Sequence, residues 1–230
     1  MKKIKYLSIE FKNEISQLEL PWFRGAVIAA AGRENGLFHN HDEQLGGYRY
    51  AYPLIQYKRI HRRAALVCLE EGVNEIHAFF QGRPRELMLG QRAITPEVEH
   101  LHLNEITLQA WDKLFTYRLH NWLALKPEHY REFQSMTDEA DRDRFLSSIL
   151  RGNLLSMAKG LGWYVDREIK VNLLYRSPMR LAHYKDTRLS AFDVRFETNI
   201  WLPRYVGLGK GGALGFGVVE NDNNHSKHNS

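Results

Sequence analysis

The spacing of apolar residues predicts strands alternating with helices over the first hundred residues. We expect strands at residues 3–11, 50–60, 62–70, 86–90 and 98–104. Two helices fit between them. Residues 20–35 start with an early proline, are rich in alanine and end at Asn35-Gly36, and residues 71–82 place apolar side chains on one face. The resulting β-α-β-β-α-β order is that of a ferredoxin-like fold.

The second half mixes strands and helices in the same way. We expect strands at residues 115–125, 167–176, 179–189, 191–200 and 214–220. Residues 126–163 between them are typical of two helices broken near Ser135–Thr137, with Thr137 or Asp138 as the N-cap. No Pro/Gly/Ser-rich linker separates the halves. We therefore expect an α+β protein whose two halves share an interface.

The charge of the chain favours a polyanionic partner. Lys and Arg number 32 against 27 Asp and Glu, which gives a net charge of +5. This balance points to nucleic acid or, less often, to an anionic membrane surface. The single cysteine, Cys68, lies in an apolar run and is expected to be buried. One cysteine cannot form a disulfide framework or a cysteine zinc site, and this usage is typical of a reducing compartment.

The N-terminal residues do not have the pattern of a signal peptide, because no long apolar region or small-residue cleavage site follows the first lysines. No apolar run approaches the ~20 residues of a membrane-spanning helix. We therefore expect a cytoplasmic protein that does not span a membrane. Residues 221–230 are polar and are expected to be disordered.

Residues 207–217 read GLGKGGALGFG, with six glycines around Lys210. Glycine allows positive φ and close backbone approach, and exposed amides in such a loop can cradle phosphate oxygens. A Walker loop needs Gly-Lys-Ser/Thr before a helix, and a dinucleotide-binding loop also opens a helix. Here a strand-like segment follows. The residues are compatible with a loop lying against an RNA backbone or with a long flexible hairpin turn.

This loop resembles the C-terminal glycine signature of the RAMP superfamily. The stretches NGLFHNH (35–41) and YRYAYPLIQYKRI (48–60) resemble one branch of its CRISPR repeat-processing endoribonucleases. The resemblance covers residues 1–220. It implies two tandem ferredoxin-like (RRM-like) domains, which we place at 1–108 and 109–220. It also implies CRISPR repeat RNA as the partner and no cofactor.

The resemblance further implies metal-independent cleavage, in which a 2′-hydroxyl attacks the adjacent phosphate and the 5′-oxygen leaves. Such a reaction needs a base, an acid and positive charge at the phosphate. His39 and His41 are two residues apart, so in an extended segment both would face one phosphate. The alternatives are surface histidines or part of a metal site with Asp42, for which no third ligand is evident. Tyr48, Tyr50 and Lys58 are reserve catalytic residues, since members of this family vary in their catalytic groups.

Two basic clusters are candidate RNA contacts, with strand packing or edge protection as the plain alternative. The first has tyrosines interleaved and consists of Arg49, Lys58, Arg59, Arg62 and Arg63. The second precedes the glycine loop and consists of Arg176, Arg180, Lys185 and Arg188, with His183 among them. The resemblance adds Lys210 and the loop glycines Gly207, Gly209, Gly211, Gly212, Gly215 and Gly217.

Three functions fit these patterns. The first is an endoribonuclease that cuts CRISPR repeat RNA, and only this one needs the histidine pair. The second is a repeat-RNA-binding RAMP subunit without catalytic activity in a CRISPR effector complex. The third is an unrelated nucleotide-binding enzyme, which would require the glycine loop to open a helix. The sequence leaves open which histidine is the acid, whether other CRISPR-associated proteins bind, and whether the chain forms a homodimer.

Overall fold

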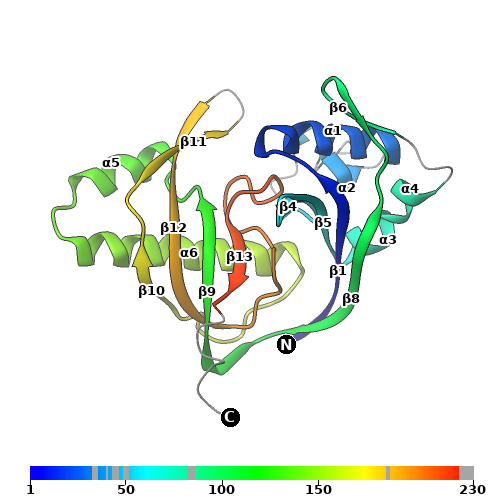
Figure 1. Ribbon diagram of the computed structural model, residues 1–230. Coiled ribbons are helices and arrows are strands. Elements are labelled where there is room, and N and C mark those ends of the chain that lie inside the picture. Colours follow the sequence, from blue (N-terminus) through cyan, green and yellow to red (C-terminus); the bar gives the residue numbers. More distant parts are fainter. Residues whose placement is uncertain are drawn as a thin grey trace, which may run out of the picture.

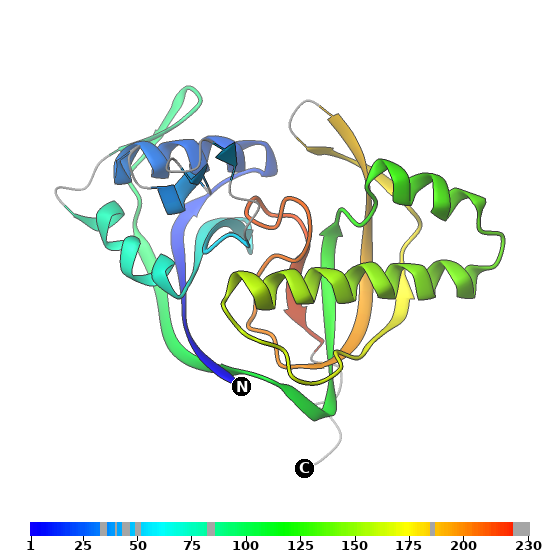
Figure 2. The same cartoon turned by 180° about the vertical axis from the view of Figure 1, so that it is seen from behind.

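Both halves of the chain form an antiparallel sheet packed against helices (Figures 1 and 2). The computed structural model describes residues 1–32, 36–39, 41–42, 47–48, 52–81, 86–184 and 187–222. The two sheets stand side by side, and the glycine-rich loop lies between them (Figure 1). This arrangement puts a segment from near the C-terminus next to the first half of the chain.

The first sheet has the strand order β4-β5-β1-β8, and neighbouring strands are antiparallel. Its main elements are β1 (Lys2–Glu14), α1 (Leu20–Ala31), β4 (Ile55–Ile60), β5 (Arg63–Leu69), α3 (Glu71–Glu75), α4 (His77–Phe80) and β8 (Val98–Leu108). Shorter elements are η1 (Gln17–Glu19), α2 (Gly36–His39), β2 (His41–Asp42), β3 (Gly47–Tyr48), β6 (Leu87–Leu89) and β7 (Arg92–Ile94). The β-α-β-β-α-β prediction is confirmed.

Two expected helices have different bounds in the structure. The helix expected to reach Asn35 ends at Ala31, because Gly32 takes a φ of +100° and its N–H donates to the Ile28 carbonyl at 3.1 Å. The helix expected over residues 71–82 is divided into α3 and α4 at Ile76. A tight turn, in which the Phe79 N–H donates to the Ile76 carbonyl, interrupts the regular helical bonding there.

The second sheet has the order β10-β12-β9-β13, with β11 paired to β12. Its elements are β9 (Ala110–Trp122), α5 (Pro127–Ser135), α6 (Glu139–Gly160), β10 (Val171–Arg176), β11 (Arg180–Tyr184), β12 (Thr187–Ile200) and β13 (Val218–Asn221). The long helix α6 covers one face of this sheet (Figure 2). The break between α5 and α6 is confirmed, with Asp138 as the N-cap that accepts a bond from the Ala140 N–H at 2.9 Å.

Both sheets have the strand order of a ferredoxin-like fold, so the tandem fold is confirmed. The second half departs from the standard order in one place. Between β12 and β13, where the first half has α3 and α4, the chain runs through residues 201–217 without a helix. In the order of elements along the chain, the segment that contains the glycine loop therefore replaces the second helix of the fold.

The two halves share an interface, as the lack of a linker predicted. Only Gln109 separates β8 from β9, so the connection is a nearly continuous strand (Figure 1). One apolar cluster combines Tyr6 and Val67 of the first half with Phe196 and Leu208 of the second. The Tyr6 hydroxyl donates to the Arg204 carbonyl at 2.8 Å across this interface. Removing these side chains from water fixes the relative position of the two sheets.

Three other sequence-based expectations can be compared with the structure. Cys68 is fully buried, and burial raises the pKa of its thiol. The expected disorder from residue 221 is wrong for its first two residues. Asn221 ends β13, and the Asp222 carboxylate, almost fully buried, pairs with Arg118 and Arg195. Within the described residues, no helix has the length and apolar character needed to cross a membrane.

Candidate functional site

The glycine loop docks on β4, the edge strand of the first sheet. The Tyr57 N–H donates to the Ala213 carbonyl at 2.8 Å, and Tyr57 and Leu214 form a parallel bridge. On either side, the Lys58 amine donates to the Gly212 carbonyl at 2.5 Å and the Gly207 N–H donates to the Gln56 side-chain oxygen at 2.8 Å. These bonds satisfy polar groups that an edge strand would otherwise expose. They fix the loop in place, which excludes a freely flexible turn.

Close backbone packing explains two of the glycines. A Cβ on Gly217, whose φ is +55°, would lie 2.0 Å from the Leu208 oxygen. A Cβ on Gly207 would lie 2.2 Å from the Gly212 oxygen. No side chain fits at either site, since real Cβ contacts are much longer. The loop is thus folded back on itself before it docks on β4.

The expected phosphate cradle is wrong for three of the glycines. The amide of Gly207 bonds Gln56, that of Gly212 bonds the Gly209 carbonyl at 3.2 Å, and that of Gly217 bonds the Asn121 carbonyl at 3.1 Å. Amides that donate inside the protein are not available to phosphate oxygens. RNA contacts by Gly209, Gly211, Gly215 and Lys210 stay a prediction. Lys210 is exposed, with its amine 5.5 Å from the Tyr184 ring centre.

The segment after the loop is the strand β13. In a Walker loop and in a dinucleotide-binding loop, the amides that bind phosphate lie at the N-terminus of the helix that follows the loop. This geometry therefore contradicts the third function, a nucleotide-binding enzyme.

The first candidate histidine lies in α2, and the second begins β2. His39 is the last residue of α2 and is half-buried. His41 pairs with Tyr48 in the short β2–β3 ladder. The expectation of one extended segment holding both histidines is therefore wrong, because the chain changes from helix to strand between them. The side chains of His41 and Tyr48, and all of Arg49, Tyr50 and Lys185, lie outside the described residues.

The end of α2 is held by two side chains from other elements. The Tyr57 hydroxyl donates to the Phe38 carbonyl at 3.1 Å, and the Arg24 guanidinium donates to the His39 carbonyl at 3.1 Å. Tyr57 is fully buried, and desolvation raises the pKa of its phenol. Tyr57 thus touches the glycine loop through its backbone and the histidine helix through its side chain. The structure brings these two distant motifs to one strand.

Lys58 is inside the protein, which corrects its expected place on an RNA-binding surface. The side chain is fully buried, and loss of solvation lowers the pKa of its amine to about 7. Among the described residues its hydrogen bond runs to Gly212, so in this structure it supports the glycine loop. A role in direct phosphate contact would require the loop to move.

Acidic residues oppose two members of the first basic cluster, Arg62 and Arg63. Arg63 pairs with Glu99, and Arg62 pairs with Glu14 at 3.5 Å. The Arg59 guanidinium donates to the Ile15 carbonyl at 2.7 Å. An unopposed basic stripe was expected because no acid is near in sequence, and the fold supplies acids from β1 and β8. Arg59 and Arg62 stay exposed at the β4–β5 turn.

In the second basic cluster, too, some arginines pair with acidic residues and others are exposed. Arg176 is mostly buried and pairs with Glu139 and with Asp143, and Arg180 pairs with Asp193 at 2.9 Å. In this structure both arginines are held by carboxylates, so a phosphate contact by either would require its ion pairs to open. Arg188 and His183 are exposed and stand opposite each other in the β11–β12 hairpin. Arg188 forms no ion pair with any described residue, so its phosphate contact stays a prediction.

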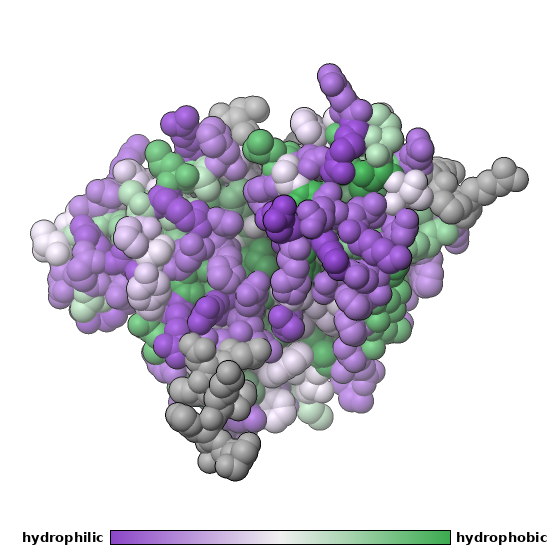
Figure 3. Space-filling view, viewed as in Figure 1, coloured by the Kyte–Doolittle hydropathy of each residue, from purple (hydrophilic) through white to green (hydrophobic). Residues whose placement is uncertain are grey.

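The open face of the second sheet carries charges of both signs. Figure 3, in the view of Figure 1, shows mainly hydrophilic residues over both halves. On this face His120 lies 3.4 Å from Glu220 and 3.9 Å from Asp193, and these carboxylates raise the pKa of His120. Such pairing leaves little unopposed positive charge for phosphates.

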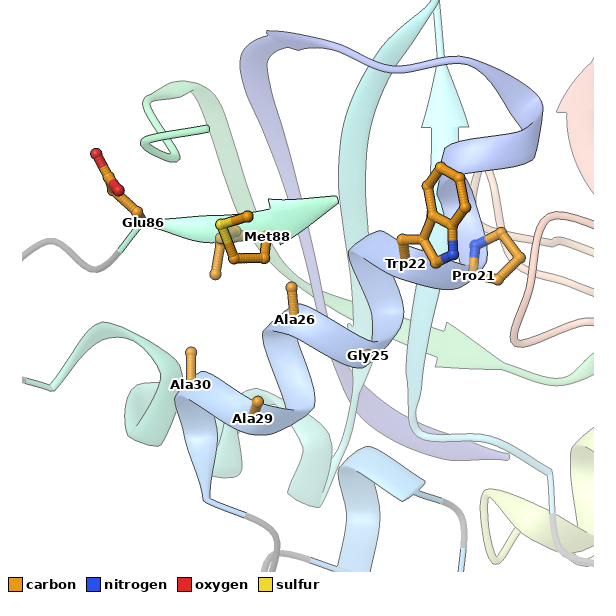
Figure 4. Close-up of a pocket in the computed structure, with 9 residues that line it drawn as sticks. Pro21, Trp22, Gly25, Ala26, Ala29, Ala30, Glu86 and Met88 are labelled. Carbon is orange, nitrogen blue, oxygen red and sulfur yellow. The ribbon is translucent and has the colours of Figure 1, made fainter. Parts of the chain in front are cut away.

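A groove between α1 and β6 is a poor candidate for acid–base chemistry. Figure 4 shows it lined by small and apolar side chains, with Glu86 as the one titratable residue among them. The lining residues are Pro21, Trp22, Gly25, Ala26, Ala29, Ala30, Glu86, Leu87 and Met88. Within the described part of the chain, no group of three or more His, Cys, Asp or Glu residues is arranged to hold a metal ion.

Two models of known protein families match the two halves of this chain. The Cas6b N-terminal domain matches residues 2–107, and the Cas6b C-terminal domain matches residues 109–222. The chain belongs to the Cas6b family. This confirms the resemblance to CRISPR repeat-processing proteins drawn from the glycine loop and from the two stretches around the histidines.

Solved structures agree with the family assignment. A crystal structure of Cas6b is 27% identical and superposes with a TM-score of 0.83, covering 96% of this chain and 100% of the other. A crystal structure of a CRISPR RNA processing endoribonuclease Cas6b is 23% identical with a TM-score of 0.69, covering 96% and 100%, and shows the shared fold. An uncharacterized protein of Methanocaldococcus jannaschii is 35% identical over 98 residues, which are 43% of this chain and 65% of that protein.

Sequence reasoning missed Gln56 and Arg24 as parts of the site, and it expected Tyr57 only as one of the tyrosine rings interleaved in the first basic cluster, whereas this ring is fully buried. No local pattern marks them, because their partners in the loop and in α2 are far away along the chain. Apolar and polar residues alternate in β4, which predicts that one side of the strand faces solvent. Gln56 and Lys58 lie on that side, yet both are buried beneath the glycine loop.

Proposed function

We propose that the protein is an endoribonuclease that binds and cleaves CRISPR repeat RNA in precursor crRNA. The observation that carries this proposal is the meeting of the histidine helix α2 and the glycine loop at β4, in a chain of the Cas6b family. Such a site can hold an RNA backbone on the loop while a histidine reaches one phosphate. A non-catalytic RNA-binding subunit would not need the histidines.

In the proposed reaction, the 2′-oxygen of one nucleotide attacks the adjacent phosphorus as the bond from phosphorus to the 5′-oxygen breaks. A base accepts the proton of the 2′-hydroxyl, and an acid protonates the leaving 5′-oxygen. We assign these tasks to His39 and His41, because imidazole changes its charge near neutral pH. We expect the exposed side chains of Lys210 and Arg188 to contact phosphates of the bound RNA. The products are a 2′,3′-cyclic phosphate and a 5′-hydroxyl, and no metal takes part.

The test uses a labelled RNA with two CRISPR repeats, incubated in EDTA with the wild-type chain. The double variant His39→Ala, His41→Ala should lose cleavage by at least ~10²-fold, the usual contribution of general acid–base groups. The matched control is His100→Ala, His102→Ala, which removes two exposed, stacked histidines from β8, at the opposite edge of the sheet. Cleavage by the first variant at the wild-type rate would contradict the assignment. RNA binding without cleavage by the wild-type chain would favour the non-catalytic subunit.

A further inference from the structure

Tyr57 connects the two motifs of the proposed site through one residue. Its N–H donates to the Ala213 carbonyl of the glycine loop at 2.8 Å, and its hydroxyl donates to the Phe38 carbonyl at 3.1 Å. Phe38 immediately precedes His39 in α2. In both views of the ribbon, β4 lies beside the loop (Figures 1 and 2). A shift of the loop at Ala213 would therefore reach the backbone next to His39 through a single side chain.

The Tyr57 ring is restrained by its neighbours as well as by the bond of its hydroxyl. It is fully buried and packs edge-on against Phe23, with ring centres 6.3 Å apart. The Arg24 guanidinium carbon lies 5.9 Å from the centre of the same ring. Arg24 also donates to the His39 carbonyl. Tyr57 and Arg24 thus form a pair that holds the last two carbonyls of α2.

The short helix α2 depends on these donors for its position. It has four residues, far below the ~12 residues at which an isolated helix becomes even marginally stable in water. The last carbonyls of any helix also have no partner within it. Here the carbonyls of Phe38 and His39 both accept side-chain bonds from other elements. The placement of His39 is therefore set by Tyr57 and Arg24 and much less by the helix itself.

We propose that Tyr57 is a positioning residue for RNA cleavage, which holds His39 at a fixed place relative to the glycine loop. This inference rests on the proposed function, in which His39 is a catalytic acid or base. Tyr57 does not touch RNA itself, since its side chain is fully buried. Its effect is expected on the rate of cleavage at saturating RNA, with little change in RNA affinity.

The test compares Tyr57→Phe with Tyr6→Phe. Both variants lose one hydroxyl from a buried tyrosine that donates to a backbone carbonyl, and Tyr6 makes its bond to Arg204 across the domain interface. Single-turnover cleavage of repeat RNA with saturating protein should slow about tenfold in Tyr57→Phe, because the Phe38 carbonyl loses its partner. Tyr6→Phe should cleave at the wild-type rate. Both should bind a 2′-deoxy repeat within about twofold of the wild-type Kd.

A double variant separates positioning of His39 from a general structural effect. In a His39→Ala background, Tyr57→Phe should cause no further loss of the residual rate, because the group that it positions is gone. Additive losses, equal losses in Tyr57→Phe and Tyr6→Phe, or a wild-type rate in Tyr57→Phe would each overturn the inference. A wild-type rate in His39→Ala would overturn the role of His39 and this inference with it. Should Tyr57→Phe fail to fold by circular dichroism, Arg24→Met removes the other donor to α2 and is judged by the same outcomes.

Discussion

The buried amine of Lys58 predicts a pH dependence of stability that can be measured directly. Burial lowers its pKa from 10.5 to about 7 in the folded protein. Between these values the unfolded chain binds the additional proton, so the free energy of unfolding rises as pH rises from about 7 to about 10.5. From the two pKa values, Lys58 alone should add about 2 kcal/mol of stability between pH 7 and pH 9.

The perturbation is Lys58→Met, which keeps an unbranched side chain only one atom shorter and removes the titrating group. Its effect combines two terms. Removing the amine abolishes the free-energy cost of burying it, which stabilises the variant. The Gly212 carbonyl also loses a hydrogen bond, which destabilises the variant by about 1–3 kcal/mol. Only the first term changes with pH. The difference in stability between wild type and variant should therefore change by about 2 kcal/mol from pH 7 to pH 9.

Urea unfolding followed by circular dichroism at pH 7, 8 and 9 gives this difference. The other titrating groups cancel, because both proteins carry them. Lys126→Met is the control, since Lys126 is exposed and its removal should leave the pH dependence as in wild type. Parallel stability curves for wild type and Lys58→Met would refute the reasoning. They would mean that the amine keeps its charge and its water in the folded protein.

Two further predictions follow from the glycine loop and its surroundings. Gly217→Ala should destabilise the protein by about 3 kcal/mol or more in urea unfolding, because φ is +55° and the new Cβ would meet the Leu208 oxygen. Gly152→Ala in α6, where a Cβ meets no atom within 4 Å, should be neutral or stabilising by up to about 1 kcal/mol, and a similar loss in both variants would contradict this account. Arg188→Ala and Lys210→Ala should each reduce the slope of log Kd against log salt for repeat RNA by about 1, in filter binding. Arg180→Ala should leave the slope unchanged because Asp193 already pairs with that arginine, and an equal reduction in all three would show that the ion pair opens for RNA.

Local patterns predicted most of the fold. The alternation in β1, the break before Asp138 and the strand after the glycine loop depend on neighbouring residues, which the sequence displays directly. The end of α1 differs from the prediction, because Gly32 ends the helix before the chain reaches Asn35. Boundaries of this kind depend on small differences between local signals.

Contacts between distant residues explain what the sequence could not supply. Arg176 and Arg180 looked like free cations because Glu139 and Asp193 approach them only in the folded chain. Lys58 looked like a surface residue because a strand edge is normally solvated. The glycine loop covers that edge, and the loop lies at the other end of the sequence. The loop itself was found from its composition, whereas its docking partner was not.

In the proposed reaction a 2′-hydroxyl of the repeat RNA is the nucleophile, and His39 and His41 transfer the protons. The most direct measurement is cleavage in EDTA of a repeat RNA with a single 2′-deoxy nucleotide at the cut position, beside the unmodified RNA. We predict that the unmodified RNA is cut at one position to give a 2′,3′-cyclic phosphate and a 5′-hydroxyl, and that the 2′-deoxy RNA is bound and left intact. Cleavage of the 2′-deoxy RNA at the same position would contradict the account, because an external nucleophile would then attack the phosphate.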